Sequence, residues 1–514
     1  MKLVKILPDK IQIKTDDAEF KNARLNDLIS VSDGEVELVT MITAITDNDV
    51  ETQMDENIIM EELQQPSLKV IECSILGSTI NGSFVQQVDR YPSTDADMKP
   101  FWNDELSIIL PYTDTGFQIG KYANYDTPAY LDGNKFYQRH SCIVGNTGCG
   151  KSETVAKIVE ETAKLPGANI VIFDIHGEYN KLSYVDSIKM GEVPFPIWML
   201  GFADMAANVL KVKEDSTVVM SALRKAYYDC ANGILPKNEG KPIRFDYIEI
   251  RDALQSLNEQ IVITGYTKDG DPKTAKGEYN GKLSGVVNTM QNLLNDKRYS
   301  FLFNGEPQSY LTDFLNRIMG GDKPVKNIDL SGIPHDIAVL IIGAITKLIY
   351  NIQIMQKDRG PITLVCDEAH VYIPTDFQLT AAQRRMVEIF ENIAKEGRKF
   401  GITLFVASQR PSELNKTIMA QCANYIVMKL NNENDKSMIK GMMSAGSADV
   451  IETTTMFSPG DCLAVGDACP IPLKIHVELA RERPQSKTIQ FWEEWSKERE
   501  SVDYVACLEE YLEN

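Results

Sequence analysis

The pattern of hydrophobic and polar positions divides the chain into regions of different character. Up to about residue 115, β-branched segments such as Val36–Ile42 and Lys69–Gly77 are separated by polar turns, which predicts several short strands and a small β-barrel. From about residue 135, short apolar runs alternate with helical segments, which is typical of a parallel sheet covered by helices on both faces. The strands expected from these runs are Ser141–Val144, Asn169–Asp174, Ile362–Asp367, Thr403–Ala407 and Tyr425–Met428.

Helical periodicity replaces this alternation between about residues 205 and 325. We interpret this region as a helical insertion between core strands, with a separately folding domain as the alternative. The polar segment Thr267–Lys282 is expected to be a loop. Two amphipathic stretches, Thr488–Arg499 and Val502–Leu512, end the sequence with apolar faces that need a partner surface. The helices expected in the insertion are Val218–Tyr228, Tyr247–Leu257, Leu283–Leu294 and Tyr310–Met319.

These patterns together predict an α/β fold whose parallel-sheet core is interrupted by the insertion. The expected divisions are 1–115 for the barrel, 116–205 and 326–480 for the two parts of the core, 206–325 for the insertion, and 481–514 for a helical tail.

A phosphate-binding loop of the pattern G-x-x-x-x-G-K-S lies between the apolar run ending at Val144 and a helical run starting at Glu153. In such a loop the glycines let backbone N–H groups point at phosphate oxygens, the lysine reaches the terminal phosphates and the serine hydroxyl ligates Mg²⁺. The sequence therefore predicts a site for a nucleoside triphosphate with Mg²⁺. The residues of this loop are Gly145, Asn146, Thr147, Gly148, Cys149, Gly150, Lys151 and Ser152.

An acidic pair, Asp367 and Glu368, follows the apolar strand that begins at Ile362. Alone, such a pair is typical of a solvated strand end. Beside a phosphate loop, Asp367 is placed to hold the Mg²⁺ shell, and Glu368 can orient and polarise the attacking water. The second carboxylate predicts hydrolysis of the nucleotide as well as its binding.

Two further polar positions follow or precede the strand at Thr403–Ala407. Gln409 comes after its end, where it can sense the γ-phosphate through the lytic water, although a polar loop before Pro411 is the alternative. Arg398 lies before the strand, at the end of a helix predicted over Ala382–Lys395. It either complements the helix dipole or acts as an arginine finger on the nucleotide of a neighbouring subunit.

The turn Asp174–Tyr179 also follows a predicted strand. Its acids either face the Mg²⁺ site or cap the turn. His176 and His370 both lie just past strand ends, but no Cys or His stands at ligand spacing from either one. We therefore expect no separate metal site at these histidines.

The composition is 43% hydrophobic and 25% charged, with a net charge of −20, and it is typical of a soluble protein of two to four modules. An acidic exterior disfavours nonspecific binding of DNA to the outer surface, although a basic channel could still hold DNA.

Nine scattered cysteines without C-x-x-C pairs indicate free thiols in a reducing cytoplasm. No signal-peptide core is found, and the uninterrupted apolar runs, such as Ile337–Ile342, are too short to span a membrane.

The joint set of motifs resembles the HerA branch of the FtsK–HerA ring ATPases over about residues 115–480. The resemblance implies a RecA-like P-loop core with a helical insertion, an N-terminal barrel of the HerA/ATP-synthase type, and a hexameric ring around double-stranded DNA. The matching stretches are Tyr130-Leu131-Asp132, Arg139-His140-Ser141, the phosphate loop, Asp174–Tyr179, Asn327–Gly332, Cys366–His370, Glu396–Phe400 and Ser408–Ser412.

Carried over by motif, Lys151 and Ser152 bind phosphate and Mg²⁺, Asp367 and Glu368 drive ATP hydrolysis, and Gln409 senses the γ-phosphate. Arg398 is implied as the finger acting in trans, with Lys399 and Arg410 as rivals. Arg139 occupies a position where the family often has an arginine near the nucleotide. Cys149 stands where serine is common, and we expect little effect beyond sensitivity to oxidation.

The resemblance implies a cytoplasmic, ATP-driven DNA translocase or helicase that works with a separately encoded nuclease or sirtuin-like effector and without a membrane. Bacterial antiphage defence is the favoured role, because the composition lacks the lysine enrichment expected of a hyperthermophile. The alternatives are a HerA–NurA-type end-resection motor in repair and a ring scaffold that activates its effector without movement; a conjugation-type DNA pump is disfavoured.

Four lysines of the predicted loop could contact DNA in a pore, although a solvated surface loop is the favoured interpretation. They are Lys268, Lys273, Lys276 and Lys282.

Overall fold

The computed structural model divides into two compact units, which we describe separately. Unit 1 comprises Met1–Ile170, Asp358–Asp376 and Phe390–Arg483; unit 2 comprises Val171–Lys357, Phe377–Ile389 and Pro484–Asn514. The structure describes the chain except residues 35, 49–67, 81, 102–104, 107–108, 111–113, 126, 214, 232–242, 304–306, 356–359, 376–378, 380, 444–447, 470, 486–490, 498–503 and 514.

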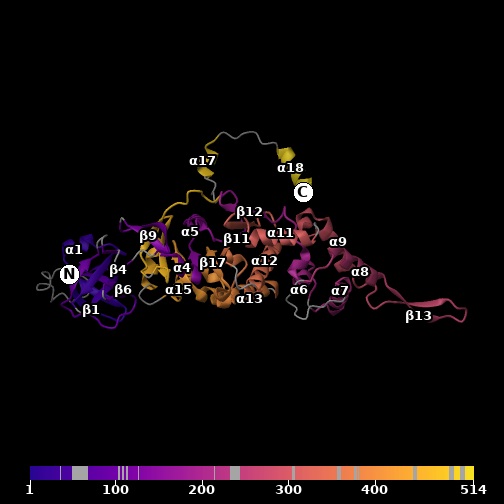
Figure 1. Ribbon diagram of the computed structural model, residues 1–514, viewed down its shortest axis with the longest axis horizontal. Helices are drawn as coiled ribbons and strands as arrows, with labels where there is room; N and C mark the ends of the chain where they lie inside the picture. Colours follow the sequence, from indigo (N-terminus) through magenta and orange to yellow (C-terminus); the bar gives the residue numbers. More distant parts are fainter. Residues whose placement is uncertain are drawn as a thin grey trace, which may run out of the picture. The chain divides into compact units, whose positions relative to one another are not determined.

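Unit 1 begins with an antiparallel sheet in the order β1-β2-β5-β4-β3-β7, with β6 paired to β5. Alternate residues of these strands, including Ile11, Ile13, Ile29 and Val31, point to one buried face, as the period of two along a strand requires. Among the described residues, the two ends of this sheet do not pair with each other, so the strands expected for a barrel form an open ladder. Its elements, indigo to violet in Figure 1, are β1 (Lys2–Ile6), β2 (Lys10–Lys14), α1 (Asp17–Asn22), β3 (Leu28–Ser32), β4 (Glu37–Asn48), β5 (Leu68–Ile80), β6 (Ser83–Val85) and β7 (Asp97–Pro100).

Among the described residues, the rest of unit 1 is built on strands in the order β16-β17-β10-β18-β19-β20-β8-β9. The first four are parallel and the others pair antiparallel. Strands β16, β17 and β10 are buried along their whole length, which explains their continuous apolar sequences. The strands are β8 (Gly116–Tyr122), β9 (Pro128–Asp132), β10 (His140–Val144), β16 (Ile362–Cys366), β17 (Ile402–Ser408), β18 (Cys422–Val427), β19 (Asp461–Gly466) and β20 (Lys474–Val477).

Helices and short turns connect these strands in unit 1. The α-helices are α4 (Gly133–Gln138), α5 (Lys151–Ala163), the end of α13 (Ala381–Glu396), α14 (Lys416–Gln421) and α15 (Glu433–Lys440). The 3₁₀ segments are η4 (Ala369–Val371), η5 (Gly397–Phe400), η6 (Pro411–Glu413) and η7 (Asp449–Met456).

In unit 2 the described strands β12, β15 and β11 lie side by side in that order, β13 pairs with β14 in a separate ribbon, and the unit also contains most of the described helices. Its strands are β11 (Ile170–Asp174), β12 (Val185–Lys189), β13 (Ile261–Tyr266), β14 (Pro272–Lys276) and β15 (Val325–Asp329). Its helices are η1 (Ile197–Leu200), α6 (Phe202–Asp204), η2 (Met205–Val209), α7 (Thr217–Cys230), α8 (Tyr247–Glu259), α9 (Ser284–Asn295), η3 (Lys297–Tyr299), α10 (Ser300–Phe303), α11 (Pro307–Met319), α12 (His335–Met355), α17 (Phe491–Trp495) and α18 (Tyr504–Glu513).

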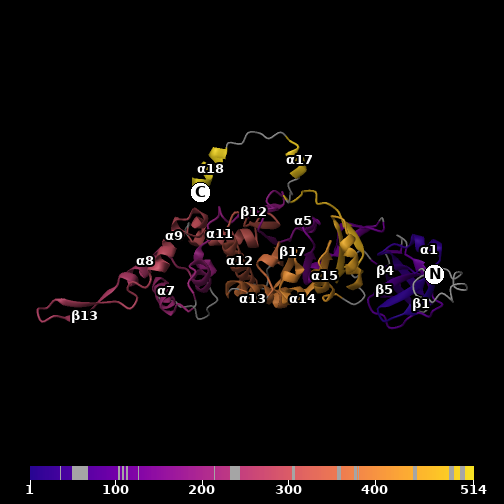
Figure 2. The same cartoon turned by 180° about the vertical axis from the view of Figure 1, so that it is seen from behind.

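Helices α7, α8, α9 and α11 match the four helices predicted for the insertion. The predicted loop Thr267–Lys282 is wrong in part, because Pro272–Lys276 forms β14 and pairs with β13. This ribbon extends beyond α8 in both views (Figure 1 and Figure 2). Local helical periodicity could not reveal it, since the pairing joins two short segments across a turn. Of the predicted tail stretches, residues 488–490, 498–499 and 502–503 lie outside the described residues.

Helix α12 corrects the sequence argument about membrane spans. By length and composition alone its 21 residues could cross a membrane. Over these residues the sequence contains only short apolar runs separated by polar residues, but a single helix contains all of these runs. In its most apolar window, 61% of the residues are buried inside the protein, as in the core helix of a folded domain. This helix is therefore weak evidence for a membrane span.

His140, the first residue of β10, ties three elements of unit 1 together. Its Nε2 lies 2.9 Å from the Ala394 carbonyl oxygen in α13, and its Nδ1 accepts a hydrogen bond of 3.0 Å from the Leu404 N–H in β17. These partners require a neutral ring with the proton on Nε2. Burial lowers the pKa of His140, which favours the same neutral form.

We expect His140→Ala to lower the free energy of unfolding by about 2–4 kcal/mol, because two buried backbone groups lose their partners. Since the folded-state pKa is lowered, His140 contributes most above its ordinary pKa, and this contribution decreases as the pH falls below that value. Thermal melts at pH 7.5 and at pH 5.5 would measure both effects. The control is His335→Ala, at an exposed histidine that begins α12, and equal melting temperatures for the two variants would contradict the prediction.

Candidate nucleotide-hydrolysis site

The phosphate loop connects the carboxyl end of β10 to the first turn of α5. Gly148 and Gly150 have φ angles of 76° and 101°, in the left-handed region that glycine adopts without strain. A methyl group on Gly145 would lie 2.7 Å from the Cys149 Sγ and 2.8 Å from the Met428 Cβ, so this position also requires glycine. The backbone conformation of the loop therefore depends on its three glycines.

Lys151 lies inside the curve of the loop and is only 6% exposed. Its Nζ donates hydrogen bonds of 2.9 Å to the Gly145 carbonyl and 3.3 Å to the Asn146 carbonyl. These contacts hold the ammonium group where a bound phosphate would lie against the loop. Ser152 is the second residue of α5 and half-buried, next to the helix N-terminus that attracts anions.

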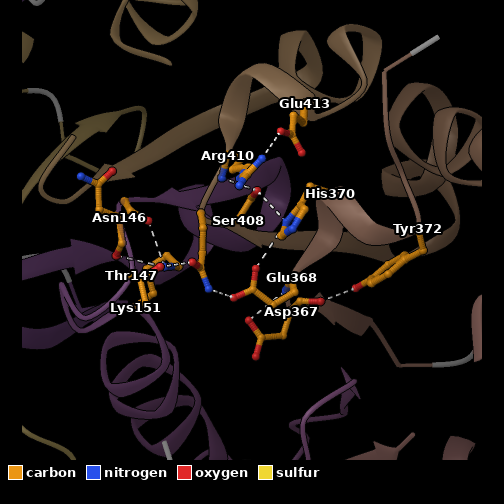
Figure 3. Close-up of polar contacts among 12 residues, drawn as sticks. Asn146, Thr147, Lys151, Asp367, Glu368, His370, Tyr372, Ser408, Arg410 and Glu413 are labelled. Carbon is orange, nitrogen blue, oxygen red and sulfur yellow. Dashed lines mark hydrogen bonds and ion pairs between the residues drawn. The ribbon is translucent and has the colours of Figure 1, made fainter. Parts of the chain in front are cut away.

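The phosphate loop, Gln409 and Glu368 follow three neighbouring parallel strands and meet at the carboxyl ends of those strands. Strand β17 lies between β10 and β16, with Val144 paired to Ser408 and Cys366 paired to Val406. The residues that follow these strands therefore lie at one edge of the sheet. Figure 3 shows Thr147 and Lys151 on one side of this site and Glu368 on the other.

Gln409 joins the loop to the acidic pair. The Thr147 hydroxyl donates to its Oε1, and its Nε2 donates to the Glu368 Oε1. A bridging amide of this kind links the position of the glutamate to the position of the loop. A change at either end can therefore be transmitted to the other.

Glu368 is 8% exposed and has a φ of 45°, an uncommon left-handed conformation for a residue other than glycine. Its Oε2 is buried and makes no hydrogen bond with the described residues, although it lies 3.3 Å from the Nδ1 of His370. The contact with His370 is long for a hydrogen bond and its ring is charged only if protonated, so this oxygen keeps its capacity to accept a hydrogen bond. A carboxylate oxygen with this free capacity can accept a proton from a water molecule.

Asp367 is 5% exposed, and its Oδ1 accepts a 3.0 Å hydrogen bond from the Glu368 N–H. The Tyr372 hydroxyl donates a 3.1 Å bond to the Asp367 carbonyl oxygen (Figure 3). These contacts fix the backbone of the acidic pair. With the Ser152 hydroxyl, the Asp367 carboxylate offers the hard oxygen ligands that Mg²⁺ prefers.

Sequence reasoning missed the polar neighbours behind the acidic pair. The His370 Nδ1 lies 3.3 Å from the Ser408 Oγ, which in turn accepts a 3.0 Å bond from the Arg410 N–H. Burial lowers the pKa of His370, although the Glu368 carboxylate acts in the opposite direction. The spacing of His370 two residues after Glu368 was a usable signal, but its link to Ser408 depends on the pairing of β16 with β17.

The structure does not bring every predicted residue to this edge. Arg139 caps the end of α4 before β10, and Arg398 lies in η5 before β17, so both stand at the opposite ends of strands that are about 16–23 Å long. Both line a cavity of about 1000 Å³ in unit 1, and Lys399 lines a neighbouring one with Arg398. Within their own chain they are therefore separated from the phosphate loop.

The charged partners of the candidate fingers also differ. Arg139 pairs with Asp467 at 3.2 Å, and Arg410 pairs with Glu413 at 2.6 Å. Arg398 is exposed, and no carboxylate within the described part of the chain forms an ion pair with it. Of the three arginines, Arg398 is the one that keeps its charge available for another group.

In unit 2, Asp174 caps its own turn. Its carboxylate accepts backbone hydrogen bonds of 2.8–3.2 Å from His176, Gly177, Glu178 and Tyr179, and a 2.9 Å bond from the Asn327 side chain. This satisfies the carboxylate without a metal, which favours the capping alternative. No cluster of three metal-ligating side chains was found among the residues that the structure describes.

Cys149 is buried, with its Sγ 3.7 Å from the Met428 Sδ. Burial raises the pKa of its thiol. The thiolate, which is the form that oxidises readily, is therefore disfavoured. This argues against the predicted sensitivity to oxidation.

Comparison with known proteins identifies the relatives of this chain. Residues 117–349 match the family model described as the central domain of the helicase HerA. A protein named DNA double-strand break repair helicase HerA from Sulfurisphaera tokodaii is 26% identical over 427 residues, covering 82% of this chain and 80% of its own. One of the same name from Saccharolobus solfataricus is 24% identical and covers 93% of this chain and 92% of its own.

A solved structure gives the same fold. VirB4 of Thermoanaerobacter pseudethanolicus matches with a TM-score of 0.50 and 17% identity, covering 72% of this chain and 98% of the VirB4 chain. At this identity the likeness bears on the fold alone.

Proposed function

We propose that this chain is a HerA-like P-loop ATPase, which hydrolyses ATP with Mg²⁺ and uses the energy to move along or unwind double-stranded DNA. The hydrogen-bonded chain from Thr147 through Gln409 to Glu368 is the observation that carries this proposal. It joins the phosphate loop to a buried carboxylate, one oxygen of which makes no hydrogen bond with the described residues and can accept one from the attacking water. The printed names of the relatives support DNA as the partner.

We assign a separate role in ATP hydrolysis to each residue of the site. Lys151 and the loop amides bind the phosphates, and Glu368 orients the attacking water and accepts its proton. Ser152 and Asp367 would hold Mg²⁺, which neutralises the charge that develops on the phosphate oxygens. Gln409 holds Glu368 in place and transmits the state of the γ-phosphate to β17.

We propose that the active form is a homo-hexameric ring. Arg398 is distant from the phosphate loop of its own chain and has no carboxylate partner among the described residues, so it can act on the nucleotide of a neighbour. A contact of this kind requires a heterologous interface that closes into a ring. The position of Arg139 at the same end of the sheet suits a supporting role at the same interface.

For the cellular role we propose bacterial antiphage defence with a separately encoded nuclease or sirtuin-like effector, in the cytoplasm and away from the membrane. The proposal is supported by an acidic composition without lysine enrichment. DNA end resection in repair is the second candidate, and the names of the relatives favour it. Affinity purification from the native host followed by mass spectrometry would distinguish them, since a phage-responsive effector and a resection nuclease are different partners.

The activity is tested by measuring ATP hydrolysis with and without duplex DNA. We expect DNA to stimulate the rate several-fold, to a degree that decreases with salt, because phosphate contacts release counterions. Lys151→Ala should remove both the basal and the stimulated rates. An ATPase rate that is unaffected by duplex DNA at low salt would contradict the proposed translocase.

A further inference from the structure

The phosphate loop has two flanks, and the site described above uses only one of them. Glu368 and Gln409 follow β16 and β17, which lie on one side of β10, so the γ-phosphate belongs on that side. On the other side lie β18, β19 and β20. A nucleotide that lies along the loop must therefore extend its nucleoside toward these three strands.

The start of β19 is in direct contact with the loop. The Gly460 N–H donates a 2.9 Å hydrogen bond to the Cys149 carbonyl oxygen. A methyl group on Gly150 would lie 3.4 Å from the Gly460 nitrogen, and one on Gly460 would lie 3.3 Å from the Cε1 of His476. His476 is thus separated from the N-terminus of α5 by the thickness of one backbone segment.

The imidazole of His476 is fixed in position although its side chain is 62% exposed. In the ladder of β19 and β20, His476 lies opposite Asp461, and its Nδ1 is 2.8 Å from the Asp461 Oδ1. The other carboxylate oxygen is 2.8 Å from the Nζ of Lys474. Burial alone would raise the pKa of Asp461, but Lys474 and His476 hold it below its ordinary value. The buried carboxylate is therefore ionised and restrains an exposed aromatic ring.

The ring borders a hollow of about 450 Å³, formed with the end of β8 and the turn that follows it. This volume lies in the range of roughly 300–1000 Å³ that is usual for sites of small molecules. Lys121 lies opposite His476 in the ladder of β8 and β20, so both side chains face the same way. The other lining residues include Tyr122, Asn124, Tyr125 and Glu478.

We propose that His476 and this hollow form the nucleoside subsite of the ATP site, with the imidazole stacked on the base. This inference rests on the proposed binding of ATP and adds the position of its base. His476 is the specificity-determining contact, and Asp461 is a positioning residue that acts through it. Stacking on a flat ring needs no particular hydrogen-bond pattern, so the contact adds affinity for nucleotides over bare phosphates.

The experiment compares two ligands by calorimetry, magnesium ATP and magnesium tripolyphosphate, in a Glu368→Gln background that does not consume the nucleotide. His476→Ala should weaken ATP binding about tenfold, in line with the loss of one stacked base. The same variant should leave tripolyphosphate binding unchanged, because the polyphosphate has no base. His476→Phe keeps an aromatic face and should restore most of the affinity for ATP.

The control is His335→Ala, at an exposed histidine of unit 2 that is outside the site. Equal losses for both ligands in His476→Ala, or no loss for either, would overturn the subsite while leaving the proposed ATPase intact. Failure of His476→Phe to bind ATP better than His476→Ala would also overturn the stacking contact. If the background protein binds neither ligand and Lys151→Ala makes no difference, the proposed function itself fails.

Discussion

Replacement of Glu368 by glutamine is expected to reduce the rate of ATP hydrolysis by about 10²–10⁴-fold, the usual contribution of a positioned general base. The amide keeps the size of the side chain and can still accept from Gln409, but it cannot take a proton from water. Binding of magnesium ATP should persist, because Lys151 and the loop are unchanged. Single-turnover hydrolysis and equilibrium binding of ATP would measure the two effects separately.

A matched control is Glu433→Gln, an exposed glutamate in α15 that pairs with Lys436 outside the site. It should retain the wild-type rate. A Glu368→Gln protein that hydrolyses ATP at the wild-type rate would remove Glu368 from the mechanism. If the same variant binds ATP, does not hydrolyse it and still activates the effector, the ring acts as a scaffold and its movement is dispensable.

Arg398→Ala is expected to lower the hydrolysis rate by about 10³-fold or more, as removal of an arginine finger does in related phosphoryl-transfer enzymes. The loss should fall on the rate and leave ATP binding nearly unchanged, because the guanidinium acts on the charge of the transition state. Mixing Arg398→Ala subunits with Lys151→Ala subunits should restore part of the activity. In such a ring, some interfaces combine an intact loop with an intact finger.

Lys399→Ala and Arg410→Ala serve as comparisons, because these two cations are the rival candidates for the finger. Lys399 directly follows Arg398 in the sequence, and Arg410 directly follows Gln409. Arg410 is engaged with Glu413, so its loss should cost little in rate. Absence of complementation in mixed rings would return Arg398 to the simpler role of complementing the dipole of α13. A larger loss from Lys399→Ala than from Arg398→Ala would assign the finger to the lysine.

The sequence by itself predicted the elements of the site and the resemblance to HerA proteins. The phosphate loop, the apolar strands before Asp367 and Gln409, and the helices of the insertion are encoded by local patterns of a few residues, and β10, β16, β17 and the four helices confirm them. The resemblance to HerA proteins is likewise confirmed by the family model over residues 117–349. Local patterns suffice there, because a strand, a glycine turn or a helix start depends mainly on neighbouring residues.

Only the tertiary structure decided how these elements combine. The order of strands in the sheet places β17 between β10 and β16, and it is this order that joins Thr147, Gln409 and Glu368. Strand direction places Arg398 at the opposite edge, and the antiparallel return of β19 and β20 brings His476 next to the loop. These contacts connect residues tens to hundreds of positions apart. Their geometry depends on strand pairing over the whole sheet, which no local pattern of residues specifies.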